Sequence, residues 1–119
     1  FHDWAIAQAS QLNGQVELIT CDAVISETFF LVQHVPGGIS ALLNFLEEGA
    51  VRLDFDLRDN VSSIAELMRK YSDVPVSVAD ASLVRMAEFE EHSLVFTVDS
   101  DFKIYRRHGR QAIPLIYPA

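Results

Sequence analysis

The stretch from Leu94 to Phe102, LVFTVDSDF, decides the fold class of this sequence. Its first half is an apolar run interrupted only by Thr97, which is typical of a parallel strand buried on both faces. Asp99 follows this run directly, and Asp101 comes two residues later. Because sites in parallel α/β folds form beyond the carboxyl ends of strands, the sequence predicts that Asp99 points into a functional site.

The rest of the chain alternates between helix-like and strand-like segments. Periodic apolar residues predict helices over residues 3–13, 22–35, 39–48, 60–72, 79–92 and 100–108. Short apolar or alternating runs predict strands over residues 17–21, 51–55, 94–98 and 113–117. Strands that alternate with helices imply βαβ units, so the sequence predicts an α/β fold with a mainly parallel sheet.

Length and composition suit a single globular domain over residues 1–119, because half of the residues are hydrophobic and 22% are charged. The one cysteine, Cys21, can form no internal disulfide and offers no thiolate cluster for zinc, which fits a reducing cytoplasm. No apolar run approaches the ~20 residues that span a bilayer, so no membrane partner is expected.

The formal net charge of −8 argues against broad electrostatic affinity for nucleic acid, which needs cations that face phosphates. Basic residues nevertheless cluster near the C-terminal end, and cations bound by the acids would invert the local field. Arg106, Arg107 and Arg110 are therefore candidates for contacts with an RNA backbone. The alternative is that this cluster is only a solvated last helical turn.

Asp99 and Asp101 are candidate metal ligands. Carboxylates that converge on one point repel each other unless a cation or protons intervene, and their hard oxygens suit Mg²⁺ or Mn²⁺. The alternative is that Asp99 or Ser100 merely caps the following short helix.

Two earlier acids, Asp80 and Glu27, extend the candidate site. Asp80 begins a helix among apolar neighbours, where an unpaired charge is costly, although capping of that helix explains it as well. Glu27 lies in a helix that is apolar nearly all round, which predicts burial and a need for a partner. The alternative is that Glu27, together with Asp22 and Ser26, forms the one solvent-exposed stripe of this helix.

Three fragments in this order and spacing resemble the PIN-domain nucleases, especially the small toxins of the virulence-associated protein C (VapC) type. The fragments are Ile25–Glu27 (ISE), Ser77–Ala81 (SVADA) and Thr97–Phe102 (TVDSDF), and Phe1–Trp4 also looks like the start of the family's first helix. The resemblance covers nearly the whole chain.

The resemblance implies a three-layer αβα fold with a mainly parallel central sheet, and RNA cleavage with Mg²⁺ or Mn²⁺. It implies that Glu27, Asp80 and Asp99 hold the metal, that Asp101 is an auxiliary acid and that Thr97 is a polar residue beside the site. It also implies a homodimer and an antitoxin protein that covers the acids. The apolar helix over residues 39–48 is a candidate dimer surface, although core burial would explain its pattern equally well.

One position departs from the family pattern. The family's first acid ends a central first strand, and nothing before Phe1 supplies this strand or this acid. We expect a segment that precedes Phe1 to carry both, because a domain without its central strand would expose unpaired sheet edges.

The resulting hypothesis is an endoribonuclease, the toxin of a toxin–antitoxin pair, that cuts RNA phosphodiesters with metal-activated water. The main alternative is a non-catalytic PIN-like module that binds a protein or RNA and has an incomplete acidic site. A phosphotransfer domain with an Asp nucleophile is a further alternative, but neither Lys70 nor Lys103 lies at a predicted strand end.

Overall fold

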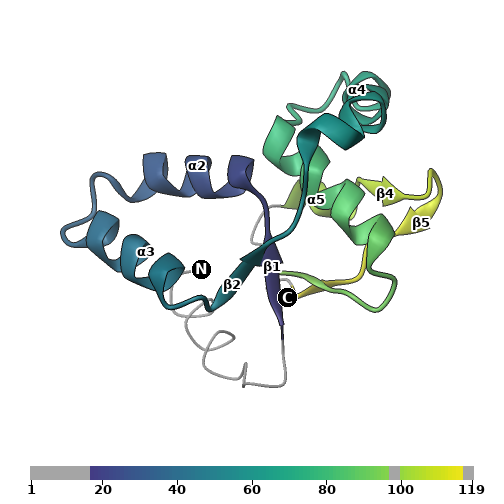
Figure 1. The fold of residues 1–119 in the computed structure, drawn as a ribbon. Coiled ribbons are helices and arrows are strands. Elements are labelled where there is room, and N and C mark those ends of the chain that lie inside the picture. The colour runs from purple at the N-terminus through teal and green to yellow at the C-terminus, as the bar shows by residue number, and fades with distance from the viewer. Residues whose placement is uncertain (1–16, 97–99, 117–119) are drawn as a thin grey trace. The chain divides into compact units, whose positions relative to one another are not determined.

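The computed structural model describes residues 17–96 and 100–116 of the chain (Figure 1). These residues belong to two compact units. The first unit is Leu18–Leu83, and the second contains Glu17 and the described residues from Val84 onward. Helix α5 (Val78–Phe89) begins in the first unit and ends in the second. No helix among the described residues is long and apolar enough to cross a membrane.

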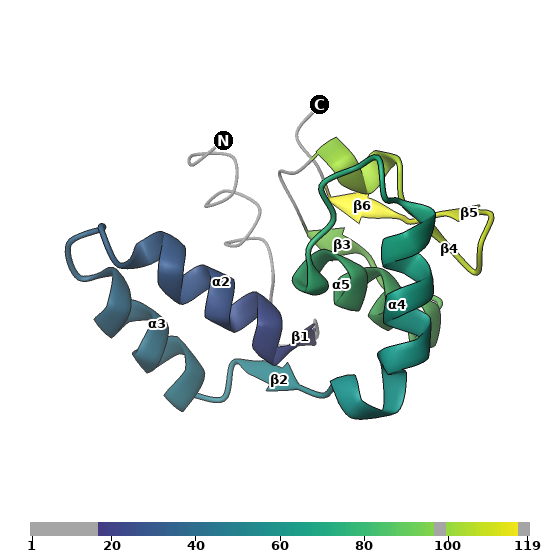
Figure 2. The same cartoon turned by 90° about the horizontal axis from the view of Figure 1, so that it is seen from above.

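A β–α–α–β arrangement opens the first unit. Strands β1 (Leu18–Thr20) and β2 (Val51–Leu53) pair in parallel. Between them, helices α2 (Asp22–Val32) and α3 (Gly38–Glu47) run side by side (Figures 1 and 2). The predicted order of strand, two helices and strand is therefore confirmed, with shorter strands than the sequence pattern predicts.

A tight reversal joins α2 to α3 at Pro36-Gly37-Gly38. A Cβ atom on Gly38 would lie 2.5 Å from the backbone oxygen of Val32, which is closer than such atoms approach in proteins. Gly37 has a φ of +74°, a left-handed conformation that glycine adopts without steric cost. The two glycines therefore allow the second helix to start directly against the end of the first.

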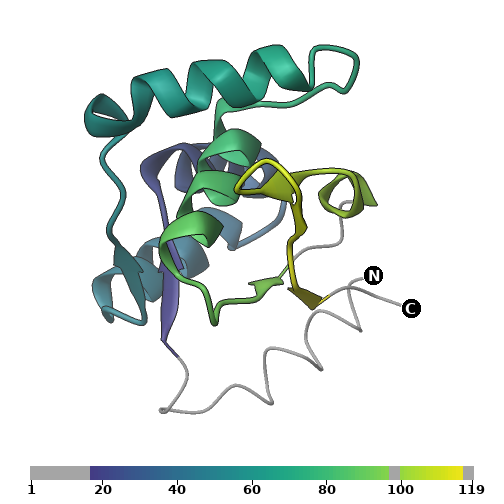
Figure 3. The same ribbon diagram turned by 90° about the vertical axis from the view of Figure 1, so that its right-hand side faces the viewer.

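The second half of the first unit is mainly helical (Figure 3). The short 3₁₀ helix η1 (Leu57–Asn60) leads into α4 (Val61–Lys70), and the chain then returns to α5. Asp56 caps η1, because its Oδ1 accepts a hydrogen bond of 2.9 Å from the backbone N–H of Arg58. The helix predicted over residues 60–72 is thus confirmed.

The second unit contains one parallel and one antiparallel strand pair. Strand β3 (Val95–Phe96) pairs in parallel with β6 (Leu115–Ile116). The 3₁₀ helix η2 (Ser100–Lys103) precedes the antiparallel hairpin of β4 (Arg106–Arg107) and β5 (Gln111–Ala112).

The helix predicted over residues 100–108 is therefore wrong beyond Lys103. The backbone φ angles of His108 and Gly109 are +52° and +78°, so two successive residues take the left-handed conformation that reverses the chain into a hairpin. Arg107 consequently pairs with Gln111 instead of continuing a helix.

The described residues thus form a mixed α/β structure, as the sequence predicts, in which two of the three strand pairs are parallel. The helix predicted over residues 3–13 lies outside the described residues, as do the ends of the two late strands at Val98 and Tyr117.

Each unit has buried apolar residues of its own. Cys21, directly before α2, is only 2% exposed and is a free thiol. Buried hydrophobic residues in the first unit are Cys21, Ile64, Tyr71, Ala79 and Ala81, and those in the second are Val84, Ala87, Val95, Phe102, Tyr105 and Ile113.

Candidate functional site

Asp80 takes part in a reciprocal cap at the start of α5. Its Oδ2 accepts a hydrogen bond of 3.2 Å from the backbone N–H of Ser77, and Ser77 Oγ accepts one of 3.0 Å from the backbone N–H of Asp80. This capping box satisfies two donors that the first helical turn would leave without a helical partner. Helix capping is therefore part of the role of Asp80, as the alternative interpretation of the sequence held.

The surroundings of Asp80 match the recessed position that its apolar neighbours predict. Asp80 is half-buried, and the adjacent Ala79 and Ala81 are buried. The bond to Ser77 fixes the direction of the carboxylate before any ligand arrives. A carboxylate oriented in this way is a suitable ligand for a hard cation, because less side-chain freedom is lost on binding.

Glu27 is exposed, and so are Asp22 and Ser26 on the same helix. The prediction that α2 is buried is wrong, because no residue of α2 is buried. When a helix packs beside one other helix, as α2 does beside α3, the neighbour covers only part of its surface. A helix that is apolar on every face therefore keeps some apolar side chains exposed. The observed exposure matches the alternative interpretation, in which Glu27 lies on a solvent-exposed stripe of the helix. A metal-binding role for this residue stays a prediction.

Asp101 is half-buried in η2 of the second unit. Its backbone carbonyl accepts hydrogen bonds from the N–H groups of Ile104 (2.9 Å) and Tyr105 (3.2 Å). The rings of Phe102 and Tyr105 are both buried and meet edge to face with their centroids 5.1 Å apart. These contacts anchor the backbone that carries Asp101. Asp99 and Thr97 lie outside the described residues.

The arginines of the basic cluster are not equivalent. Arg107 is 5% exposed, and its guanidinium donates to the backbone carbonyls of Ala87 and Glu91, at 3.2 Å each. Arg106 donates through one nitrogen to the carbonyls of Lys103, Ile104 and Tyr105. Arg110, by contrast, is exposed. The burial of Arg107 disfavours the predicted RNA contact, because its donors already satisfy carbonyls at the end of a helix.

The sequence matches the family model of the PIN domain over residues 2–107. The chain belongs to the PIN domain family. PIN domains are generally nucleases and commonly bind divalent metals. Among curated proteins, none matches the chain.

The donor chemistry of this PIN domain fits a divalent cation, because all four candidate ligands are carboxylates. Among residues 17–96 and 100–116, however, no three acidic, histidine or cysteine side chains lie close enough together to hold a metal ion. Glu27 and Asp80 belong to the first unit, and Asp101 belongs to the second. The described residues alone therefore do not complete a ligand set.

Two residues that hold a candidate region in place, Ser77 beside Asp80 and Glu88 beside the basic cluster, were missed in the sequence. Ser77 could have been found, since a serine three residues before an acid at a helix start is the signature of a capping box. Glu88 could not, because its hydrogen-bond partner, the backbone N–H of His108, lies 20 residues away in the chain.

Proposed function

We propose that this PIN domain is an Mg²⁺- or Mn²⁺-dependent endoribonuclease that hydrolyses RNA phosphodiester bonds. The observation that carries the proposal is the PIN match over residues 2–107, which contains all the predicted acids: Glu27, Asp80, Asp99 and Asp101. The oriented, half-buried carboxylate of Asp80 supports it independently.

In this proposal Glu27, Asp80 and Asp99 are the metal ligands, and Ser77 keeps the Asp80 carboxylate in place. Asp101 orients a ligand or a water molecule, and Thr97 fixes Asp99 or contacts the phosphate. A bound cation would supply a water of lowered pKa and would neutralise charge on the scissile phosphate. No side chain has to form a covalent bond to the substrate.

The test of catalysis is hydrolysis of end-labelled single-stranded RNA by the full-length protein, with Mg²⁺, with Mn²⁺ and with EDTA. Asp99→Asn should lower the cleavage rate by about 100-fold or more, the upper range for loss of a residue that supports a metal. Cleavage that is equal for both proteins, or that persists in EDTA, contradicts the proposal.

Metal binding can be measured without catalysis. Mn²⁺ should raise the thermal unfolding temperature of the full-length protein, because a ligand that binds only the folded state stabilises it. Asp80→Asn should lose this shift. Asp73→Asn is the matched control, since Asp73 is an exposed acid that no proposed role involves. A shift that survives in Asp80→Asn removes this residue from the ligand set.

The exposure of Glu27 favours one second candidate, a PIN module that binds a protein or RNA without cutting it. This candidate predicts RNA or protein binding that neither EDTA nor Asp80→Asn changes. It also predicts no metal-dependent cleavage of RNA and no Mn²⁺-dependent thermal shift, so the two measurements above separate it from the nuclease.

The resemblance to VapC-type toxins supports three finer proposals: a three-layer fold, a homodimer and a cognate antitoxin. Helix α3 is the candidate dimer surface, and the structure leaves Ile39, Leu43 and Phe45 exposed on it. The alternative that core burial explains this helix is not supported, because no residue of α3 is buried. Sedimentation of the full-length protein and of Leu43→Asp tests the dimer, since the charge should dissociate it.

A further inference from the structure

The β4–β5 hairpin has a strained turn. His108 is the one non-glycine residue with a positive φ in the described part of the chain. Side chains with a Cβ atom adopt this conformation at a steric cost, so surrounding contacts must hold it. The contacts that hold the hairpin come from the C-terminal half of α5, within the second unit.

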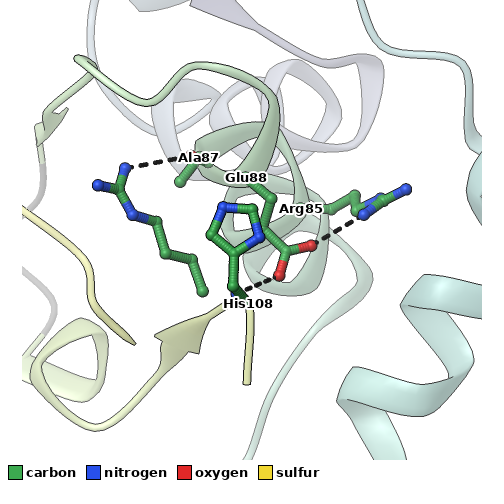
Figure 4. A network of polar contacts seen from close by, with 5 residues as sticks. Arg85, Ala87, Glu88 and His108 are labelled. Carbon is green, nitrogen blue, oxygen red and sulfur yellow. Dashed lines mark hydrogen bonds and ion pairs between the residues drawn. The ribbon is translucent and has the colours of Figure 1, made fainter. Parts of the chain in front are cut away.

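Glu88 of α5 makes the first of these contacts (Figure 4). Its Oε2 accepts a hydrogen bond of 2.5 Å from the backbone N–H of His108, and its Oε1 accepts one of 3.0 Å from Arg85. The Glu88 side chain is only 12% exposed. Hydrogen bonds to an ionised carboxylate are shorter and stronger than neutral ones, so Glu88 fixes the backbone at the strained residue.

Arg107 makes the second contact. Its guanidinium binds the carbonyls of Ala87 and Glu91 near the end of α5, and its Nε donates to Gln111 Oε1 at 3.2 Å on the opposite strand. One buried arginine therefore joins the helix end to both strands of the hairpin. Together with Glu88 it determines how the hairpin projects from the second unit.

The tip that these contacts hold consists of His108, Gly109 and Arg110, and all three are exposed. Arg110 therefore places its charge in solvent at the end of a fixed turn, in a chain whose formal net charge is −8. Lys103, also exposed, adds a second positive charge to this unit. A positive charge carried on a fixed backbone turn suits a phosphate oxygen of a nucleic acid backbone.

We propose that Glu88 is a positioning residue, which fixes the β4–β5 hairpin so that Arg110 binds the phosphate backbone of RNA. This inference rests on the proposed ribonuclease function. Because Glu88 is an acidic residue, its removal should affect RNA affinity in two opposite ways. By long-range electrostatics alone, removal of Glu88 should strengthen RNA binding, whereas loss of its hydrogen bond to His108 should weaken it.

A matched pair of variants separates these two effects. Glu88→Gln and Glu88→Met both remove the charge and have similar size, but only glutamine keeps an oxygen that can accept from His108. Affinity is measured by fluorescence anisotropy with labelled single-stranded RNA and the full-length protein in EDTA, where metal-dependent cleavage is blocked. Glu88→Gln should bind RNA at least as tightly as the wild type, and Glu88→Met should bind about threefold more weakly, within the range of one exposed ionic contact.

Arg110→Gln should weaken RNA binding about fivefold, the effect of losing one exposed ionic contact. Arg52→Gln is the control, because Arg52 is an exposed arginine in the first unit that pairs with Asp54, and it should change affinity by less. Amide hydrogen exchange at His108 should be faster in Glu88→Met than in Glu88→Gln. Arg110→Gln also keeps the proposal testable if Glu88→Met does not fold.

Equal affinities of Glu88→Gln and Glu88→Met, or an unchanged affinity of Arg110→Gln, would overturn the inference and leave the ribonuclease proposal intact. Absence of RNA binding and of metal-dependent cleavage by the wild type would overturn both.

Discussion

Helices α2 and α5 each carry one of the predicted acids, but they are built in opposite ways. Helix α2 is rich in large apolar side chains, yet no residue of it is buried, and Phe30 and Leu31 are 69% and 70% exposed. Helix α5 has a more mixed composition, yet several of its small residues are almost inaccessible. Those that are buried are Ala79, Ala81, Ser82, Val84 and Ala87.

The difference shows that the apolar content of a helix does not measure its burial. Small side chains let a helix backbone come close to its neighbours, so several residues of α5 are buried. Large side chains that point in every direction cannot all be covered by one adjacent helix, and α2 packs beside α3. The acid on α5 is consequently half-buried and oriented, whereas the acid on α2 is exposed.

Val84→Asp in α5 should have the largest effect on stability. Val84 is 1% exposed, so the new carboxylate would be buried without a partner, which should cost about 4 kcal/mol of unfolding free energy. Urea unfolding followed by circular dichroism measures this. The control is Val61→Asp, the same exchange at a 57%-exposed position in the first turn of α4, where an acid is tolerated. Similar losses in both variants would contradict the burial of α5.

Ser77→Ala should have an intermediate effect. It removes the hydrogen bond from the backbone N–H of Asp80 to Ser77 Oγ, and loss of such a cap costs about 1 kcal/mol. Ser62→Ala in α4 is the control, because Ser62 is exposed and is not the N-cap residue of its helix. If the two variants unfold at the same urea concentration, the capping box contributes nothing.

Phe30→Ser in α2 should have the smallest effect, within about 0.5 kcal/mol, since an exposed side chain loses few contacts. Phe102→Ser, at a 2%-exposed ring, should cost about 3 kcal/mol or more by the same measurement. A large loss for Phe30→Ser would show that this ring is covered in solution. Sedimentation at several protein concentrations would then reveal whether a second copy of the chain covers it.

Much of the fold follows from local sequence signals. The helices from residue 22 to residue 92 are predicted by periodicity and by breakers such as Pro36-Gly37-Gly38, because these signals act within a few residues. The β4–β5 hairpin is not predicted, since a helical pattern and a turn through His108 compete there. Contacts from α5, distant in the chain, favour the turn.

The candidate site is less accessible to sequence reasoning than the fold. The recessed position of Asp80 is predicted by its apolar neighbours, and the observed burial agrees. The exposure of Glu27 agrees only with the alternative interpretation of its helix, and the burial of Arg107 is not predicted, because each depends on which segments pack together. Whether a charged side chain is buried depends on contacts with segments distant in the sequence. Hydrophobic periodicity shows only which face of a single helix is apolar.

The single cysteine provides a natural reporter of local opening. Cys21 lies between β1 and α2, and its thiol is almost inaccessible. A thiol-specific reagent can react with it only when this junction separates from its neighbours, and no other cysteine of the sequence competes for the reagent. The labelling rate under native conditions therefore measures how often the chain opens at the first turn of the helix that carries Glu27.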